Sequence, residues 1–124
     1  MAQMPDVTPL QIERRLIDLG KELDDSYKEL EAAEHGYMTA KAAWEIDSAG
    51  CRLRIRSKYL EMGSKVTVGE VEDEMIIACK DQMTSLYIAE AIVKSARANA
   101  SRIRTQIEIG RSVGASVRTS MEIL

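Results

Sequence analysis

The sequence predicts an all-α protein in which two long antiparallel helices form a coiled-coil hairpin. First, both prolines, Pro5 and Pro9, lie near the start, so no proline interrupts residues 10–124. Second, apolar residues recur at heptad spacing through two long segments. Third, these segments are separated by one short break, residues 62–67. We expect two copies to assemble into a four-helix bundle, or more copies into a larger oligomer, because two helices of this length leave apolar surface uncovered.

Helix one is expected over about residues 9–61, after a flexible tail at residues 1–8. Thr8-Pro9-Leu10-Gln11 has the pattern of a helix start: threonine at the N-cap, proline at the first helical position and glutamine closing a capping box. The core positions that follow have heptad spacing, with Ser26 in one of them. They are Leu16, Leu19, Leu23, Leu30, Ala33, Tyr37, Ala40, Trp44 and Cys51.

The apolar pattern changes after Trp44. There a second line, Ile46, Ala49, Leu53 and Leu60, is the more apolar one, which indicates a stutter or a change of packing partner. Gly36 and Gly50 also interrupt helix one. Either glycine is compatible with a kink or with a close helix–helix approach, and the sequence does not choose between them.

The turn is expected at residues 62–67. Gly63 can end a helix in the left-handed conformation, and Thr67-x-x-Glu70 is a capping box for the next helix. We expect helix two to run over about residues 68–118, completing a single domain at 9–124. Its heptad positions are Cys79, Leu86, Ala89, Val93, Ala96, Ala100, Ile103 and Ile107. Beyond Ile109 the apolar stripe weakens through Gly110 and Gly114.

Charge supports antiparallel folding. Residues 13–34 hold eight acidic and four basic side chains, whereas residues 94–118 hold six basic side chains and one acidic side chain. Next to the turn the signs reverse: bases dominate 52–65 and acids dominate 70–81. A hairpin places each block beside its opposite, although each exposed ion pair contributes only about 0.2–1 kcal/mol.

Composition favours a cytoplasmic protein. The chain has 124 residues and a net charge of −3, with no basic and apolar leader at its start. It also lacks a run of about 18 apolar residues, so we expect no membrane partner. Two cysteines, Cys51 and Cys79, are too few for a secreted disulfide framework. A hairpin would bring them close together. We interpret them as small core residues, with a redox bridge as the alternative.

Two groups of residues are candidates for contacts with partners. The basic group suits a nucleic acid or an acidic partner, although solvated or intramolecularly paired bases are the simpler interpretation. Its members are Arg52, Arg54, Arg56, Lys58, Arg97, Arg102 and Arg104. The apolar group is expected in the core or in an oligomer interface. Its members are Leu23, Leu30, Tyr37, Trp44, Leu53, Leu86, Val93, Ile103 and Ile107.

No catalytic, cofactor or metal site is predicted. His35 is the single histidine, there is no CxxC, and Glu-x-x-His does not occur. Glycine-rich phosphate loops, GxSxG and HExxH are also absent. The acidic residues lie in helical charge runs, where nothing indicates the burial that would tune their pKa values. We therefore expect a protein that is not an enzyme and needs no cofactor.

Three segments together resemble small helical-hairpin proteins encoded by bacteriophages, particularly those of actinobacteria. They are Lys41-Ala42-Ala43-Trp44-Glu45, Thr67-Val68-Gly69-Glu70 and Ala98-Asn99-Ala100-Ser101-Arg102-Ile103-Arg104-Thr105-Gln106. The resemblance covers about residues 10–120. It implies a protein of the host bacterial cytoplasm that is associated with replication or recombination functions. It assigns no site residues.

The function expected first is that of an oligomeric adaptor that binds another protein through helix surfaces, as a phage early protein acting on a host or phage factor would. The alternative is an accessory protein of replication or recombination that binds nucleic acid through residues 52–58 and 97–111. An enzyme ranks last.

Overall fold

The computed structural model describes residues 8–123 as three α-helices, with no β-strand in that range. Helix α1 spans Pro9–Glu61, the range expected from the sequence, α2 spans Val68–Ala78 and α3 spans Lys80–Ile123. The all-α class and the packing of the two long helices against each other are confirmed. Assembly into a larger bundle stays a prediction. Apart from Thr8, the expected tail lies outside the described residues.

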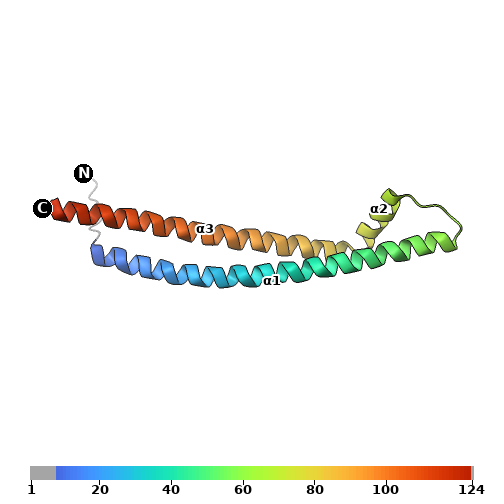
Figure 1. The fold of residues 1–124 in the computed structure, drawn as a ribbon, viewed down its shortest axis with the longest axis horizontal. Coiled ribbons are helices and arrows are strands. Elements are labelled where there is room, and N and C mark those ends of the chain that lie inside the picture. The colour runs from blue at the N-terminus through green and yellow to red at the C-terminus, as the bar shows by residue number, and fades with distance from the viewer. Residues whose placement is uncertain (1–7, 124) are drawn as a thin grey trace. The chain divides into compact units, whose positions relative to one another are not determined.

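The chain divides into two compact units. Unit 1 combines the described parts of Met1–Glu31 and Ser95–Leu124, and unit 2 is Ala32–Lys94. In unit 1 the blue start of α1 lies beside the red end of α3, so the helices are antiparallel (Figure 1). In unit 2 the turn leads back through α2 and the start of α3 along the green part of α1 (Figure 1). The predicted single helical domain therefore contains two units.

Both predicted helix starts form as expected. The Thr8 N–H donates to Gln11 Oε1 at 3.0 Å, and the Gln11 N–H donates to Thr8 Oγ1 at 3.2 Å. These reciprocal bonds are a capping box, which pairs backbone donors that the first helical turn leaves free. At the start of α2, the Glu70 N–H donates to Thr67 Oγ1 at 3.1 Å.

Gly63 ends α1 as predicted. It is the glycine with positive φ, +68°. The Gly63 N–H donates to the Leu60 carbonyl at 3.1 Å, and the Ser64 N–H donates to the Tyr59 carbonyl at 3.0 Å. This pair of bonds is a Schellman motif, which needs a left-handed residue at this position and therefore favours glycine.

The expected second helix is divided at Cys79, which corrects the prediction of one helix over 68–118. Cys79 leaves the helical conformation with φ −108° and ψ 23°, and α3 then continues to Ile123. The buried residues Val71, Met75 and Cys79 are spaced by four. Because a regular helix turns about 100° per residue, each such step rotates the buried face by about 40°. Helical hydrogen bonds continue across the junction: the Cys79 N–H donates to the Met75 carbonyl at 2.8 Å, and the Met83 N–H donates to the Cys79 carbonyl at 3.0 Å.

The core of unit 2 contains Cys51, Ile55, Val71, Met75 and Cys79. The side chains of Trp44, Tyr59 and Val66 pack against it. Beyond Trp44, the buried line of α1 therefore continues through Ser48, Cys51 and Ile55. The line expected to replace it, which includes Ile46, Leu53 and Leu60, is exposed instead.

Unit 1 has a thinner core with small residues at its closest approach. Its buried residues are Ile12, Leu19, Ser26, Ala100, Ile103 and Gly114. Ser26 is a buried polar residue in this stripe, and its hydroxyl accepts a hydrogen bond from Asn99 Nδ2 at 3.4 Å.

Gly110 and Gly114 continue the apolar stripe of α3, contrary to the expectation that it weakens there. A Cβ on Gly110 would lie 2.9 Å from Leu16 Cδ2, and one on Gly114 would lie 3.2 Å from Ile12 Cγ2. The side chains of Leu16 and Ile12 on α1 therefore occupy the space that side chains at Gly110 and Gly114 would need. By contrast, a Cβ on Gly36 would meet no atom within 4 Å, and one on Gly50 would meet the Arg54 guanidinium at 3.5 Å. Neither of the two glycines singled out from the sequence is a point of close helix–helix approach.

Candidate interaction surface

The basic run of unit 2 does not form one stripe. Alternate residues step by about 200° around a helix, so Arg52 and Arg56 lie on one side of α1, and Arg54 and Lys58 lie on the other. The Arg52 guanidinium binds the Glu72 carboxylate of α2 through two hydrogen bonds, Nε–Oε1 at 2.7 Å and Nη2–Oε2 at 3.3 Å. This pair joins a basic residue of α1 to an acidic residue of α2, as the charge pattern beside the turn predicted. It also engages Arg52, one of the four bases of this run that were candidates for nucleic-acid binding.

The other bases of the run have separate surroundings. Lys58 Nζ lies 5.7 Å from the centre of the Tyr59 ring. Arg54 and Arg56 are exposed. The Tyr59 hydroxyl itself donates a hydrogen bond to the Glu74 carboxylate. That bond, together with burial and the charges of Glu74 and Glu70, raises the pKa of Tyr59 above its ordinary 10.0.

The candidate bases of unit 1 are exposed on α3 and partly engaged within the chain. Arg102 Nη2 donates to Asn99 Oδ1 at 2.8 Å, and the Arg104 guanidinium lies 6.0 Å from the centre of the Tyr27 ring. Arg97 is also exposed.

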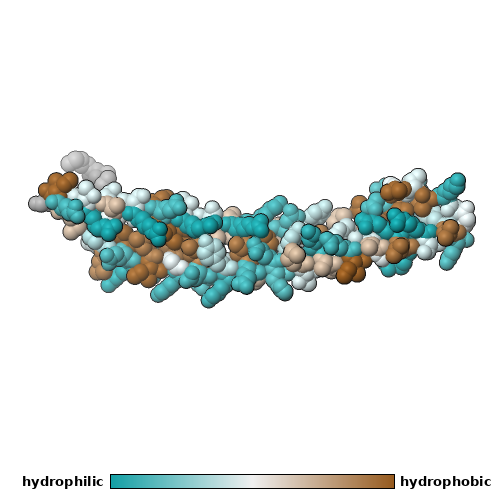
Figure 2. All heavy atoms as spheres, viewed as in Figure 1, coloured by the Kyte–Doolittle hydropathy of each residue, from teal (hydrophilic) through white to brown (hydrophobic). Residues whose placement is uncertain are grey.

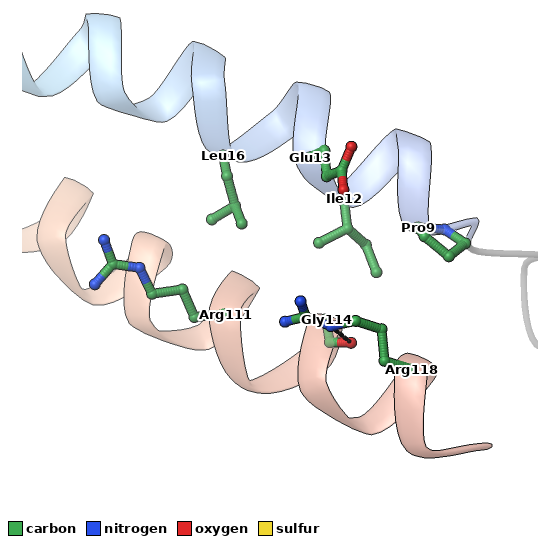
Figure 3. A pocket seen from close by; sticks show the side chains of 7 residues that line it. All are labelled: Pro9, Ile12, Glu13, Leu16, Arg111, Gly114 and Arg118. Carbon is green, nitrogen blue, oxygen red and sulfur yellow. Dashed lines mark hydrogen bonds between the residues drawn. The ribbon is translucent and has the colours of Figure 1, made fainter. Parts of the chain in front are cut away.

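Arg104, Arg111 and Arg118 recur every seven residues along α3, a regularity that residue-by-residue inspection of the sequence overlooked. Arg111 and Arg118 border a hollow of about 110 Å³ over Ile12 and Gly114 (Figure 3). Arg118 Nε donates to the Gly114 carbonyl at 3.3 Å. The α3 side of this hollow is therefore positively charged.

Most residues predicted for the core or an interface are at least half-buried. Val93 and Ile103 are buried. Six others are half-buried: Leu23, Leu30, Tyr37, Trp44, Leu86 and Ile107. Leu53 is the exception, with 63% of its surface exposed. As a core residue of this chain it was predicted wrongly, because the buried line passes through Ile55; its role in an oligomer stays a prediction.

Leu53 belongs to an apolar line on α1, which we call the seam. Its large members are strongly exposed: Ile46 at 72%, Leu53 at 63% and Leu60 at 81%. They are seven residues apart, and the small residues Ala43, Gly50 and Ser57 alternate with them. Brown apolar patches interrupt the teal polar surface around α2 and elsewhere (Figure 2). A heptad line with this exposure is the pattern of a helix that lacks one packing partner.

A second feature of unit 2 is a cleft of about 350 Å³ beside the seam. It is lined by Ile46, Asp47, Gly50, Cys51, Arg54, Ala78, Cys79 and Gln82. Both cysteines are buried free thiols, as expected of core residues. Cys79 Sγ lies 3.9 Å from the Asp47 carbonyl oxygen. The sequence indicated that the cysteines would be close, but the break at Cys79 and the cleft carry no sequence signal.

The electrostatics of the cleft keep Cys79 protonated. Burial raises the pKa of the Cys79 thiol above its ordinary value, and a hydrogen bond with Cys51 and the charges of Cys51 and Asp47 add to the rise. Arg54 acts in the opposite direction. Because the thiolate is the reactive form, the raised pKa makes Cys79 a weak nucleophile at neutral pH.

Within residues 8–123, no group of three or more histidine, cysteine or acidic side chains is placed to hold a metal ion. None of the described helices has a segment long and apolar enough to cross a membrane. Comparison with protein-family models, with curated proteins and with solved structures finds no match to this chain. The resemblance to phage-encoded helical hairpins stays a prediction. What the chain does is therefore inferred from its own residues.

Proposed function

We propose that this protein is a non-enzymatic adaptor that self-associates through the seam of unit 2 and binds another protein through its remaining helix surfaces. The observation that carries the proposal is the exposure of Ile46, Leu53 and Leu60, three large apolar side chains at heptad spacing. Burying one such side chain against a partner contributes about 1.5–3 kcal/mol.

A second copy of the chain fits the seam. Large and small residues alternate along it, so two seams laid together place the large side chains of one copy over the small residues of the other. Small residues at such positions let helices approach closely, and an interface built from the same patch on both subunits is the commonest arrangement of homodimers.

Nucleic-acid binding is the weaker alternative. Arg52 is paired with Glu72, Arg102 is bonded to Asn99, and Arg104 lies over Tyr27. In addition, the bases of 52–58 point to two sides of α1. A polyanion would therefore have to displace existing contacts, and it would meet the acidic side chains of α1 nearby.

Light scattering of the purified chain tests the proposal. We expect a mass of at least two chains of 13.8 kDa at low and high salt, unchanged by a pool of single- and double-stranded nucleic acid. Leu53→Glu should shift the mass toward the monomer, because it places a charge in the seam. Met38→Glu is the matched control, since Met38 is 59% exposed on the same helix but lies off the seam.

Two outcomes would contradict the proposal. One is a wild-type monomer, and the other is a Leu53→Glu variant that keeps its mass and its helicity. A heavier species that forms with nucleic acid and disappears at high salt would favour the alternative. In that case Arg54→Ala/Arg56→Ala should abolish it, and this double variant spares the Arg52–Glu72 pair.

A further inference from the structure

Two thiols share the cleft of unit 2. Cys51 and Cys79 each retain only 4% of their surface exposed, and both line the cleft of about 350 Å³. They belong to the same cluster of buried residues in unit 2. The pair thus combines membership of one small buried cluster with a cleft through which a small reagent can enter.

The two cysteines differ in their backbone setting. Cys51 lies inside α1, whereas Cys79 is the residue between α2 and α3, with φ −108° and ψ 23°. A disulfide needs its two Cα atoms about 4.4–6.8 Å apart and a particular dihedral angle about the sulfur–sulfur bond. The Cys79 N–H still donates to the Met75 carbonyl at 2.8 Å, and its carbonyl accepts from the Met83 N–H at 3.0 Å, so side-chain rotation at both cysteines has to meet that requirement.

We propose that Cys51 and Cys79 are a modification site at which a low-molecular-weight disulfide, such as oxidised glutathione, converts the two thiols into an intramolecular disulfide. This inference does not require the proposed self-association, and a chain paired through the seam should react more slowly, because the seam residues Ile46 and Gly50 also line the cleft.

The reaction is thiol–disulfide exchange in two steps. One cysteine loses its proton to solvent, and its thiolate attacks a sulfur of the reagent, which breaks the reagent's sulfur–sulfur bond and releases one thiolate that takes up a proton. The other cysteine is then deprotonated and attacks the mixed disulfide, forming the Cys51–Cys79 bond and releasing the second small thiol. Two protein thiols are oxidised and one reagent disulfide is reduced to two thiols.

The surroundings of Cys79 set the pH dependence of this reaction. Burial and Asp47 keep the pKa of Cys79 above its ordinary value, so its thiolate is scarce at neutral pH. The exchange should therefore be slow near pH 7 and accelerate as the pH rises. Arg54, which opposes the rise, should favour the reaction, and Arg54→Ala should slow it.

The bond would fasten α1 to the α2–α3 junction. It closes a loop from residue 51 to residue 79, and closing a loop of this length restricts the unfolded chain. The expected effect on the unfolding equilibrium constant is a decrease on the order of a hundredfold. The oxidised chain should therefore unfold at a higher urea concentration than the reduced chain.

The test uses the full chain, reduced and then incubated with oxidised glutathione at pH 8.5, in native buffer and in urea. Remaining thiols are alkylated before intact-mass measurement and peptide mapping. We expect the native protein to lose two hydrogens, to take up no alkyl group and to yield a Cys51–Cys79 cross-linked peptide from a single chain. The single variants Cys51→Ser and Cys79→Ser, with helicity checked by circular dichroism, should instead accumulate a glutathione adduct, because no second thiol resolves it.

Three results would overturn the inference. They are a native protein in which both thiols are alkylated, a stable glutathione adduct or interchain dimer in place of the internal bond, and a ratio of internal bond to glutathione adduct that is no higher in native buffer than in urea. None of these readouts depends on the oligomer mass, so failure of the disulfide and failure of the proposed self-association are distinguished.

Discussion

The helices of the two units pack against each other in different ways: through glycines in unit 1 and around large side chains in unit 2. In unit 1 the side chains of Leu16 and Ile12 occupy the space over Gly110 and Gly114. In unit 2 three helical segments surround large side chains such as Ile55 and Met75.

The difference predicts opposite sensitivities. In unit 1 the helices pack closely because α3 has glycines, Gly110 and Gly114, opposite α1, so a larger side chain at these positions should destabilise the unit. Unit 2 is close-packed because large side chains fill its interior, so removing atoms there should destabilise it. Substitutions of opposite kind can therefore separate the two packing modes.

The largest effect is expected for Met75→Ala in unit 2. Met75 is 1% exposed, and truncating a buried side chain of this size costs about 2–5 kcal/mol, because apolar contacts are lost and a cavity remains. Urea unfolding followed by circular dichroism measures the change. Ile77→Ala is the matched control: Ile77 lies on the same helix but is 74% exposed, and surface substitutions usually change stability by less than about 0.5 kcal/mol. Equal effects of the two substitutions would show that α2 is not packed as described.

How much of this could be read from the sequence differs between the units. The helix class, the start at Thr8 and the stop at Gly63 depend on local chemistry, namely capping hydroxyls and a left-handed glycine, and they were predicted. The core positions before Trp44 followed from heptad spacing alone. The approximate meeting of Cys51 and Cys79 followed from their equal distance to the turn.

The remaining features depend on what lies opposite each residue. Gly110 and Gly114 reduce apolarity in the sequence, yet their missing side chains accommodate Leu16 and Ile12. Ile46 and Leu53 form an attractive apolar line, yet α2 packs on the neighbouring face of α1, which presents Cys51 and Ile55. The break at Cys79 contains neither proline nor glycine. No residue type at this position marks the break in the sequence.

A smaller effect of the opposite kind is expected in unit 1. Gly110→Leu inserts a side chain where even a Cβ would lie 2.9 Å from Leu16 Cδ2, and such overpacking costs about 1–3 kcal/mol. Gly20→Leu is the matched control, since a Cβ on Gly20 meets no atom within 4 Å. That control should be neutral or stabilising by up to about 1 kcal/mol, because leucine favours helix more than glycine does. Thermal unfolding of both variants checks the pair, and a Gly110→Leu protein as stable as Gly20→Leu would contradict the close approach.

The smallest effect concerns a tyrosine of unit 2. In unit 1 Tyr27 lies under the Arg104 guanidinium, whereas in unit 2 Tyr59 donates its hydroxyl to the Glu74 carboxylate. A donated hydrogen bond to an anion stabilises the protonated phenol, which is why the pKa of Tyr59 is raised from 10.0. The associated stability is fully present below about pH 10 and is lost as the pH rises through the higher pKa of the folded state.

Difference absorbance titration can isolate this group. Subtracting the titration of Tyr59→Phe from that of the wild type leaves the ionisation of Tyr59, which should occur above pH 10.0 in the folded chain and close to 10.0 in urea. Glu74→Ala should lower this folded-state pKa by more than Glu70→Ala does, because Glu74 supplies both the hydrogen bond and a charge, whereas Glu70 supplies a weaker charge effect alone. If both variants shift the titration equally, the raised pKa reflects the acidic face of α2 as a whole. A larger shift for Glu74→Ala would instead show that Tyr59 fastens the end of α1 to α2 through one specific bond.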